Sequence, residues 1–216
     1  MITVYGAYNF PPFLKGIVRD LRLFWALEEV GLPYDVHWMD TSKGEQKLPP
    51  NRLINPFGKI PSLENGGHRM FESGAGVLYI YEQVGKAPQD AHARAELNQW
   101  CFAALNTVEP VFLEIFRWDR FWVDKSGREW RYPELIGLAH ERLADIATGL
   151  ADRSYLLGEF GPADILMATV LDFAAHAPEA FESSPAMRAY LDRCHARPAY
   201  KRALARQGEG PKAAAA

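Results

Sequence analysis

Residues 55–63 read NPFGKIPSL and residues 71–75 read FESGA. We interpret this stretch as a turn, a strand that begins at Pro61, a hairpin at residues 65–67, a second strand and a helix that opens at Ser73. Because proline has no N–H, a strand that starts at Pro61 leaves the amide and carbonyl of Ile60 available to an extended, peptide-like ligand. X-Pro bonds adopt the cis form more readily than other peptide bonds, so the bond between Ile60 and Pro61 is a candidate cis bond.

The residues after the hairpin have opposite preferences for charge. Ser73 at a helix start offers a hydroxyl, free backbone amides and the positive end of the helix dipole, which together suit a carboxylate. Glu72 beside it suits an ammonium group. Together with the strand edge at Ile60, these residues predict a binding site for a small zwitterionic peptide.

The bulk composition is that of an ordinary soluble protein. The chain has 216 residues, of which 48% are hydrophobic, and a formal net charge of -3, which makes nucleic acid a poor partner. No apolar run approaches the roughly 20 residues that cross a bilayer, and the N-terminus leads into a strand without a signal segment, so we expect a cytoplasmic protein without a membrane partner. Cys101 and Cys194 lie far apart and no His or Cys spacing suits zinc, so no metal is expected.

The first part of the chain alternates between strand and helix patterns. Strand patterns occupy residues 2–5 and 34–38, and a helical pattern from about Ile17 ends at Gly31, which we interpret as a C-cap. A loop with a short irregular helix is expected at residues 41–53, before the hairpin and the helix that opens at Ser73. The order strand, helix, strand, helix, strand, strand, helix is typical of a thioredoxin-like domain, which we place at residues 1–85.

Strand patterns disappear after an expected linker at residues 86–90. Helical patterns rich in large apolar residues predict an all-helical domain at residues 91–206, in which Pro110 is expected to kink the first helix and Asp164 to favour the start of a later one. Residues 207–216 have the composition of a flexible tail. The predicted fold class is therefore α/β plus all-α, with a thioredoxin-like N-terminal domain followed by an all-helical C-terminal domain.

The paired motifs at residues 55–63 and 71–75 resemble the glutathione-binding half of cytosolic glutathione transferases, and the resemblance covers nearly the whole chain. It implies that Ile60, the residue before Pro61, pairs with the cysteinyl backbone of glutathione. It also implies that Glu72 and Ser73 hold the γ-glutamyl end. Lys59 is the candidate partner of the glycine carboxylate.

The resemblance further implies a group that lowers the pKa of the glutathione thiol, because a free thiol with a pKa of about 8.5 is mostly protonated at neutral pH. In the family this group is a Tyr, Ser or Cys between the first strand and the first helix. Residues 6–20 contain no serine, threonine or cysteine, and the absence of cysteine argues against the branches that form a mixed disulfide with glutathione. The chain thus resembles a bacterial-type branch without a catalytic cysteine. Four candidates stay open: Tyr5, Tyr8, Asn9 and Arg19. Arg19 and Arg22 lie three residues apart on the polar face of the first helix, where a solvated face is the alternative.

An aromatic cluster in the helical domain is the expected site of a second, hydrophobic substrate. Charged residues interrupt the cluster, so we do not expect it to be wholly buried. Its members are Phe112, Phe116, Trp118, Phe121 and Trp122.

The activity that the resemblance implies is conjugation of glutathione, the co-substrate, to a small hydrophobic electrophile in detoxification. Two alternatives stay open: a cysteine-independent, glutathione-dependent peroxidase or disulfide reductase, and a non-catalytic glutathione-binding protein. Two-domain members of the family usually pair as symmetric dimers. A homodimer is therefore expected, with the helix from Ser73 and the long helix after the linker as contact elements.

Overall fold

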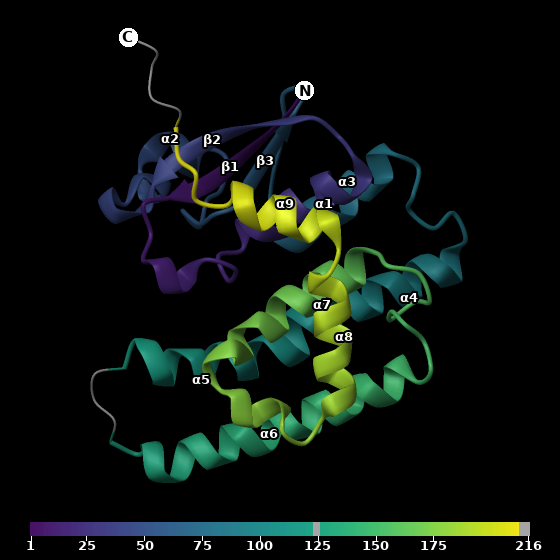
Figure 1. Cartoon of the computed structure of the whole chain (residues 1–216). Helices are drawn as coiled ribbons and strands as arrows, with labels where there is room; N and C mark the ends of the chain where they lie inside the picture. The colour runs from purple at the N-terminus through teal and green to yellow at the C-terminus, as the bar shows by residue number, and fades with distance from the viewer. Residues whose placement is uncertain (123–125, 212–216) are drawn as a thin grey trace. The chain divides into compact units, whose positions relative to one another are not determined.

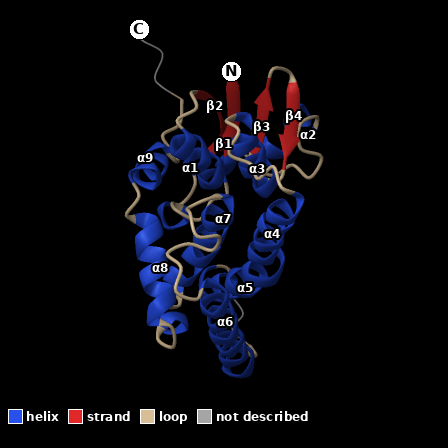
Figure 2. Ribbon diagram, turned by 90° about the vertical axis from the view of Figure 1, so that its right-hand side faces the viewer, coloured by secondary structure: helices blue, strands red, loops and turns tan. Residues whose placement is uncertain are grey.

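The computed structural model of the chain describes residues 1–122 and 126–211. The chain divides into two compact units, one formed by Met1–Ala87 together with Arg197–Ala216 and the other by Pro88–Ala196 (Figure 1). In the described part of the chain every strand belongs to the first unit, and the second unit is helical (Figure 2). The predicted fold class, a thioredoxin-like part followed by helices, is confirmed.

The first unit is built on a four-stranded sheet with the strand order β2-β1-β3-β4. Strand β1 pairs in parallel with β2 and antiparallel with β3, and β3 pairs antiparallel with β4. This combination of a parallel βαβ unit and an antiparallel hairpin is the thioredoxin-like arrangement. The elements are β1 (Ile2–Tyr8), α1 (Asp20–Val30), β2 (Tyr34–Asp40), α2 (Pro49–Arg52), β3 (Ser62–Asn65), β4 (His68–Phe71), α3 (Ser73–Gln83) and α9 (Pro198–Arg206), with short 3-10 helices at Pro12–Leu14, Thr41–Lys43 and Glu45–Lys47.

One face of the sheet is buried by α1 and α3 because alternate residues of the strands are apolar. Val4 of β1 and Leu63 of β3 are almost fully buried on that face and pair in the ladder. The two helices approach each other closely at Gly76, where an added Cβ would lie 2.6 Å from a methyl carbon of Leu23. A side chain at this position would therefore force Leu23 to move.

Helix α1 begins later than its sequence pattern suggested. The apolar pattern predicted a start near Ile17, whereas the helix starts at Asp20. Gly16 has a φ of +93°, a left-handed conformation that does not occur within an α-helix, and the chain first becomes α-helical at Asp20. Ile17 is nevertheless buried, which is why it extended the apolar pattern. The predicted C-cap at Gly31 is confirmed by its left-handed conformation.

The second unit consists of helices around a buried core. The long pattern after the linker forms two α-helices joined by one wide π-helical segment, η4, which ends two residues before Pro110. Pro110, at which a kink was predicted, lies in the first turn of α5, directly after this π-helical segment. The elements are α4 (Ala91–Phe102), η4 (Ala103–Val108), α5 (Glu109–Arg120), α6 (Arg128–Leu150), α7 (Pro162–Leu171), α8 (Pro185–His195) and the 3-10 helices η5 (Asp172–His176) and η6 (Pro178–Phe181). No helix of the described chain has the length and apolar character to span a membrane.

The carboxylate of Asp164 makes several hydrogen bonds in the core of the second unit. Asp164, in the first turn of α7, is 1% exposed. It accepts hydrogen bonds from the amides of Leu156 and Gly161, both at 3.0 Å, and from the Tyr190 hydroxyl at 2.8 Å. Because Gly161 has no side chain to cap α7, Asp164 supplies the hydrogen bonds that fix the start of this helix. Burial raises the pKa of Asp164.

The chain returns to the first unit after α8. Helix α9 packs on α1, with the rings of Trp25 and Tyr200 4.7 Å apart and with Arg202 paired to Glu28 at 2.7 Å. The sequence had placed residues 91–206 in the helical domain, whereas the contacts group the chain from Arg197 onward with the first unit. In the segment expected as a flexible tail, residues 207–211 are described and 212–216 lie outside the described residues.

Candidate functional site

The first part of the site is a turn that presents Ile60. The side chain of Asn55, 3% exposed, accepts a hydrogen bond from the Phe57 amide and donates one to the Lys59 carbonyl, both at 3.0 Å. Gly58 has a φ of +59°, and an added Cβ would lie 3.3 Å from the Gln46 carbonyl oxygen. A glycine is therefore required inside this turn.

The peptide bond between Ile60 and Pro61 is cis, as the sequence predicted. The sheet ladder begins one residue later, where Ser62 pairs with Tyr5. The amide and carbonyl of Ile60 make no hydrogen bond to another described residue. Pro61 is buried and Ile60 is half-buried, so the free backbone groups stand at the end of a fixed strand.

The second part of the site is the start of α3. This helix begins at Ser73, as predicted, and the preceding Glu72 has a φ of +71° and a ψ of 112°. Such a conformation costs a residue with a side chain about 1–3 kcal/mol and often marks a functional site. The Glu72 side chain is exposed, while Ser73 is 5% exposed. The helix therefore presents a carboxylate at its edge and a hydroxyl at its positive end.

Arg22 of α1 contacts the side chain of Ser73. Its guanidinium donates a hydrogen bond to the Ser73 hydroxyl at 3.1 Å, and the residue is only 2% exposed. The sequence pattern had placed Arg22 with Arg19 on a polar helix face, and for Arg22 this is wrong. The signal available in the sequence was a single charged residue between Leu21 and Leu23 within an apolar run. A buried positive charge next to Ser73 makes the start of α3 more favourable for an anion.

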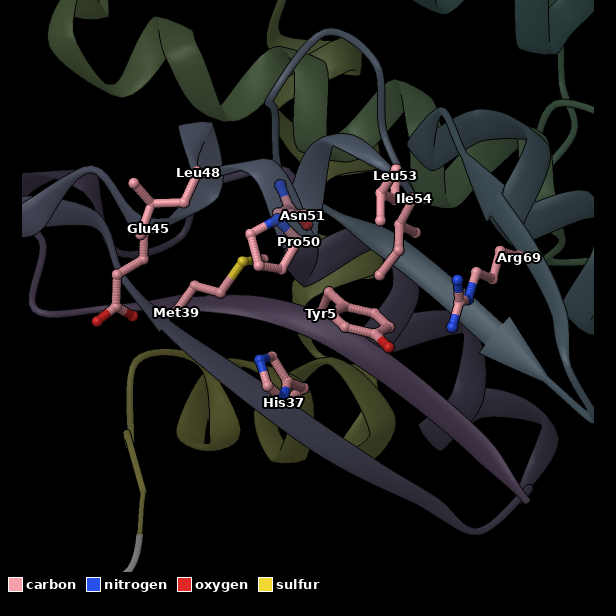
Figure 3. A pocket seen from close by; sticks show the side chains of 10 residues that line it. All are labelled: Tyr5, His37, Met39, Glu45, Leu48, Pro50, Asn51, Leu53, Ile54 and Arg69. Carbon is pink, nitrogen blue, oxygen red and sulfur yellow. The ribbon is translucent and has the colours of Figure 1, made fainter.

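Tyr5 is one of the four candidates for lowering the pKa of the glutathione thiol. It lies in a pocket on the face of the sheet opposite to α1 and α3. This pocket of about 490 Å³ lies between the sheet and the segment that contains α2 (Figure 3). The Tyr5 hydroxyl donates to Glu64 at 3.1 Å, and its ring lies 5.0 Å from the ring of His37. Burial and this hydrogen bond raise the pKa of Tyr5. The lining residues are Tyr5, His37, Met39, Glu45, Leu48, Pro50, Asn51, Leu53, Ile54 and Arg69. They include neither Ile60 nor Ser73, although the backbone of Tyr5 pairs with Ser62, the residue after Pro61.

Asn9 is engaged at the end of the sheet. Its amide group donates to the carboxylate of Asp40 at 3.2 Å and to the Ser42 hydroxyl at 3.0 Å. The hydrogen bonds from Ser42 and Asn9 lower the pKa of Asp40 to about 2, so this carboxylate is ionised at neutral pH and holds the amide. Asn9 therefore orders the loop between β1 and α1.

Tyr8 and Arg19 frame the two ends of the same loop. Tyr8 is the last residue of β1, and its carbonyl accepts a hydrogen bond from Thr41 at 3.1 Å. Its hydroxyl makes no hydrogen bond within the described chain. Arg19 immediately precedes α1, whose first residue is Asp20. These two candidates thus lie at the end of β1 and at the positive end of α1.

The predicted second-substrate cluster in the second unit divides into two groups. Phe112, Phe116 and Trp118 are 0%, 3% and 7% exposed and belong to the core. Phe121 is 52% exposed and its ring lies 5.5 Å from that of Phe116. Trp122 is 40% exposed and its ring lies 4.0 Å from that of Trp118. The open part of the cluster consists of Phe121 and Trp122, which the core aromatics support.

The sheet order and the cis proline before β3 define a thioredoxin-like fold. The start of α3 carries a buried serine that accepts a hydrogen bond from a buried arginine. Residues 14–82 match the family model for the N-terminal domain of glutathione S-transferase. Glutathione S-transferase D7 of Drosophila melanogaster is 30% identical over 170 residues, which cover 76% of this chain and 72% of the relative. The chain belongs to the glutathione S-transferase family.

Two further similarities extend over almost the full length. Glutathione S-transferase F9 of Arabidopsis thaliana is 26% identical over 233 residues, which cover 95% of this chain and 97% of the relative. A glutathione transferase from Burkholderia graminis, whose crystal structure holds two glutathione molecules per subunit, superposes with a TM-score of 0.83 at 25% identity. That alignment covers 97% of this chain and 89% of the other.

Proposed function

We propose that this protein is a glutathione transferase that binds glutathione in its first unit, stabilises the thiolate and conjugates it to a small hydrophobic electrophile. The observation that carries the proposal is the unpaired backbone of Ile60 before a cis proline, next to a helix start whose serine contacts a buried arginine. The crystal structure of the Burkholderia graminis relative with bound glutathione supports the choice of ligand.

The proposed binding mode uses three neighbouring segments. The amide and carbonyl of Ile60 pair with the cysteinyl unit in the manner of an added strand. The Ser73 hydroxyl and the free amides of α3 hold the γ-glutamyl carboxylate, and Glu72 takes the γ-glutamyl ammonium. The exposed Lys59 meets the glycine carboxylate. Arg22 contributes positive charge through its hydrogen bond to Ser73.

The chemistry we propose is conjugation by a non-cysteine enzyme of the bacterial type, with no protein nucleophile. The loop between β1 and α1 contains no cysteine, and both cysteines of the chain are buried in the second unit. Burial raises the pKa of Cys101 to about 12, so this thiol stays protonated and unreactive. The thiolate of glutathione itself is the proposed nucleophile.

For thiol activation, Tyr8 is the strongest of the four candidates, and Arg19 stays a candidate because of its position before α1. The Tyr5 hydroxyl and the Asn9 amide already donate to carboxylates. The Tyr8 hydroxyl has no partner in the described chain, and Arg19 stands at the positive end of α1. Single replacements Tyr8→Phe and Arg19→Gln, with the thiolate absorbance of bound glutathione followed against pH, test which group lowers the thiol pKa.

The remaining parts of the proposal concern the second substrate and the assembly. We assign the electrophile to the surface that carries Phe121 and Trp122 in the second unit, Pro88–Ala196. The proposed protein is a cytoplasmic homodimer that contacts its partner through α3 and α4. Sedimentation velocity of the purified chain tests the assembly.

Calorimetric titration with reduced glutathione tests the binding site. Ser73→Ala removes the hydroxyl and one hydrogen bond of a buried guanidinium, so we expect the dissociation constant to rise at least about tenfold. Ser62→Ala is the matched control, because this serine is also buried but its hydroxyl makes no hydrogen bond in the described chain. Absence of binding by the wild-type protein at several millimolar ligand would refute the proposed function.

A further inference from the structure

The side chain of Gln207, directly after α9, makes hydrogen bonds to the loop that precedes α1 and to the first residue of α1. Gln207 is 1% exposed. Its amide nitrogen donates to the Val18 carbonyl at 2.9 Å and to the carboxylate of Asp20 at 2.6 Å, and its amide oxygen accepts from the Gly16 amide at 2.7 Å. One side chain therefore fixes three positions that lie about 190 residues away in the sequence.

The chemistry of these partners determines the orientation of the Gln207 amide. Val18 and Asp20 offer only oxygen acceptors at the contact, and Gly16 offers an N–H donor. The reverse orientation would place oxygen against oxygen and nitrogen against an N–H group. Neither a carboxylate nor an apolar side chain of the same length can make all three hydrogen bonds.

Asp20 extends the connection to the end of β1. Its carboxylate also accepts a hydrogen bond from the Ala7 amide at 2.8 Å, and the residue is fully buried. Gln207 and Asp20 together thus tie the last turn of the loop to the strand before it. A buried carboxylate and a buried N–H would lose hydrogen bonds if the glutamine amide were removed, so the connection is costly to break.

The residues that follow Gln207 cover the other end of the loop. An added Cβ on Gly208 would lie 3.0 Å from the Phe10 ring, and one on Gly210 would lie 3.0 Å from the Tyr8 ring. Both glycines also have a positive φ, +78° and +74°. The backbone after α9 can therefore lie directly against the aromatic residues at the start of the loop.

From these contacts we infer that Gln207 is a positioning residue for thiol activation: it holds the β1–α1 loop, through Gly16 and Asp20, in the conformation that ionises bound glutathione. The inference rests on the proposed function, because Tyr8 and Arg19 lie at the two ends of this loop. The residues assigned to bind the peptide, Ile60 and Ser73, lie on other elements and make no hydrogen bond to Gln207 within the described residues. Loss of the Gln207 amide should therefore affect ionisation of the thiol more than affinity for glutathione.

The test compares wild type with Gln207→Met and Gln207→Glu. Methionine keeps the length and fills the buried space without hydrogen bonds, and glutamate keeps the acceptor for Gly16 but places a second carboxylate against Asp20. Lys201→Ala, at an exposed position on α9, is the control. The measurements are the pH dependence of thiolate absorbance in the glutathione complex, calorimetric affinity for glutathione, and thermal stability.

We expect both Gln207 variants to raise the pKa of the bound thiol by about one unit, with the glutathione dissociation constant changed by less than about threefold. If the variants fold with a lower melting temperature but ionise the thiol as wild type does, Gln207 is a stability residue only and the inference is overturned. A wild-type protein that binds glutathione without lowering the thiol pKa would instead overturn the proposed function, and this inference with it. If one variant does not fold, the other decides.

Discussion

Replacing Asn55 by alanine should loosen the turn that presents Ile60. The Asn55 side chain makes two hydrogen bonds, to the Phe57 amide and the Lys59 carbonyl, both at 3.0 Å. Each contributes about 1 kcal/mol net to folding, so the free energy of unfolding should fall by about 2 kcal/mol. For a chain of this length that corresponds to a decrease in Tm of about 4–8 °C.

The effect on ligand binding follows from backbone freedom at Ile60. Fixing the backbone of one residue costs about 1–2 kcal/mol, which the wild-type turn supplies before the ligand arrives. If the variant must order Ile60 on binding, the dissociation constant for glutathione should rise by about 5- to 30-fold. Isothermal titration calorimetry measures this below the Tm of the variant, and differential scanning calorimetry measures the stability.

Two further variants separate the contributions. Asn55→Asp keeps the acceptor for the Phe57 amide but loses the donor to the Lys59 carbonyl. Its Tm and its dissociation constant for glutathione should therefore lie between those of wild type and Asn55→Ala. Asn65→Ala is the matched control. This asparagine lies at the hairpin end of β3, the strand that follows Ile60, and donates a hydrogen bond to the Tyr79 hydroxyl at 3.0 Å. An Asn55→Ala protein with a reduced Tm and an unchanged dissociation constant would refute the reasoning. So would a control that weakens binding equally.

Three predictions concern the stability of the fold. Asp164→Ala should lower the free energy of unfolding by about 3–5 kcal/mol in urea titrations, because it removes all three hydrogen bonds of a buried carboxylate, and Tyr190→Phe, which removes one, should cost about 1 kcal/mol. Gly76→Val should cost about 2 kcal/mol by the same measurement, since even the first added carbon lies 2.6 Å from Leu23, and a stable variant would show that α1 and α3 pack more loosely. Burial raises the pKa of Asp20 to about 6, above the value of about 3.9 in an unfolded chain, so the native state binds the proton more tightly. Its contribution to the free energy of unfolding, about 3 kcal/mol in total, is fully present below about pH 4 and is lost as the pH rises through about 6. The free energy of unfolding of wild type should therefore fall over this pH range, and that of Asp20→Asn should not show this fall.

The sequence predicted what depends on short-range pattern. The hairpin, the cis bond before Pro61 and the helix start at Ser73 follow from turn chemistry and from the position of one proline, which act over a few residues. The two-part fold class followed from the change of periodicity after the linker. These features could be predicted because the information that specifies each one lies within the element itself.

The features that the sequence did not reveal depend on contacts between distant segments. Arg22 looks solvated by helical spacing, yet it is buried against Ser73, 51 residues further on. The hydroxyl of Tyr5 is used by Glu64 on a neighbouring strand, which no local pattern indicates. Gln207 lies in a polar, alanine-rich terminus that has the composition of a loose tail, but its three hydrogen bonds reach back to the first loop. Burial of a polar side chain is decided by its partners, and sequence spacing does not identify them.

The return of α9 to the first unit has a consequence for the order in which the protein can fold as it is synthesised. Residues Met1–Ala87 leave the ribosome first, but Trp25 of α1 is covered by Tyr200, which is translated only after the whole helical unit. The nascent first unit therefore exposes an apolar helix surface until α9 emerges. A fragment that ends at Ala87 should expose that surface permanently, and a soluble, isolated first unit requires residues from Arg197 onward to be joined to it.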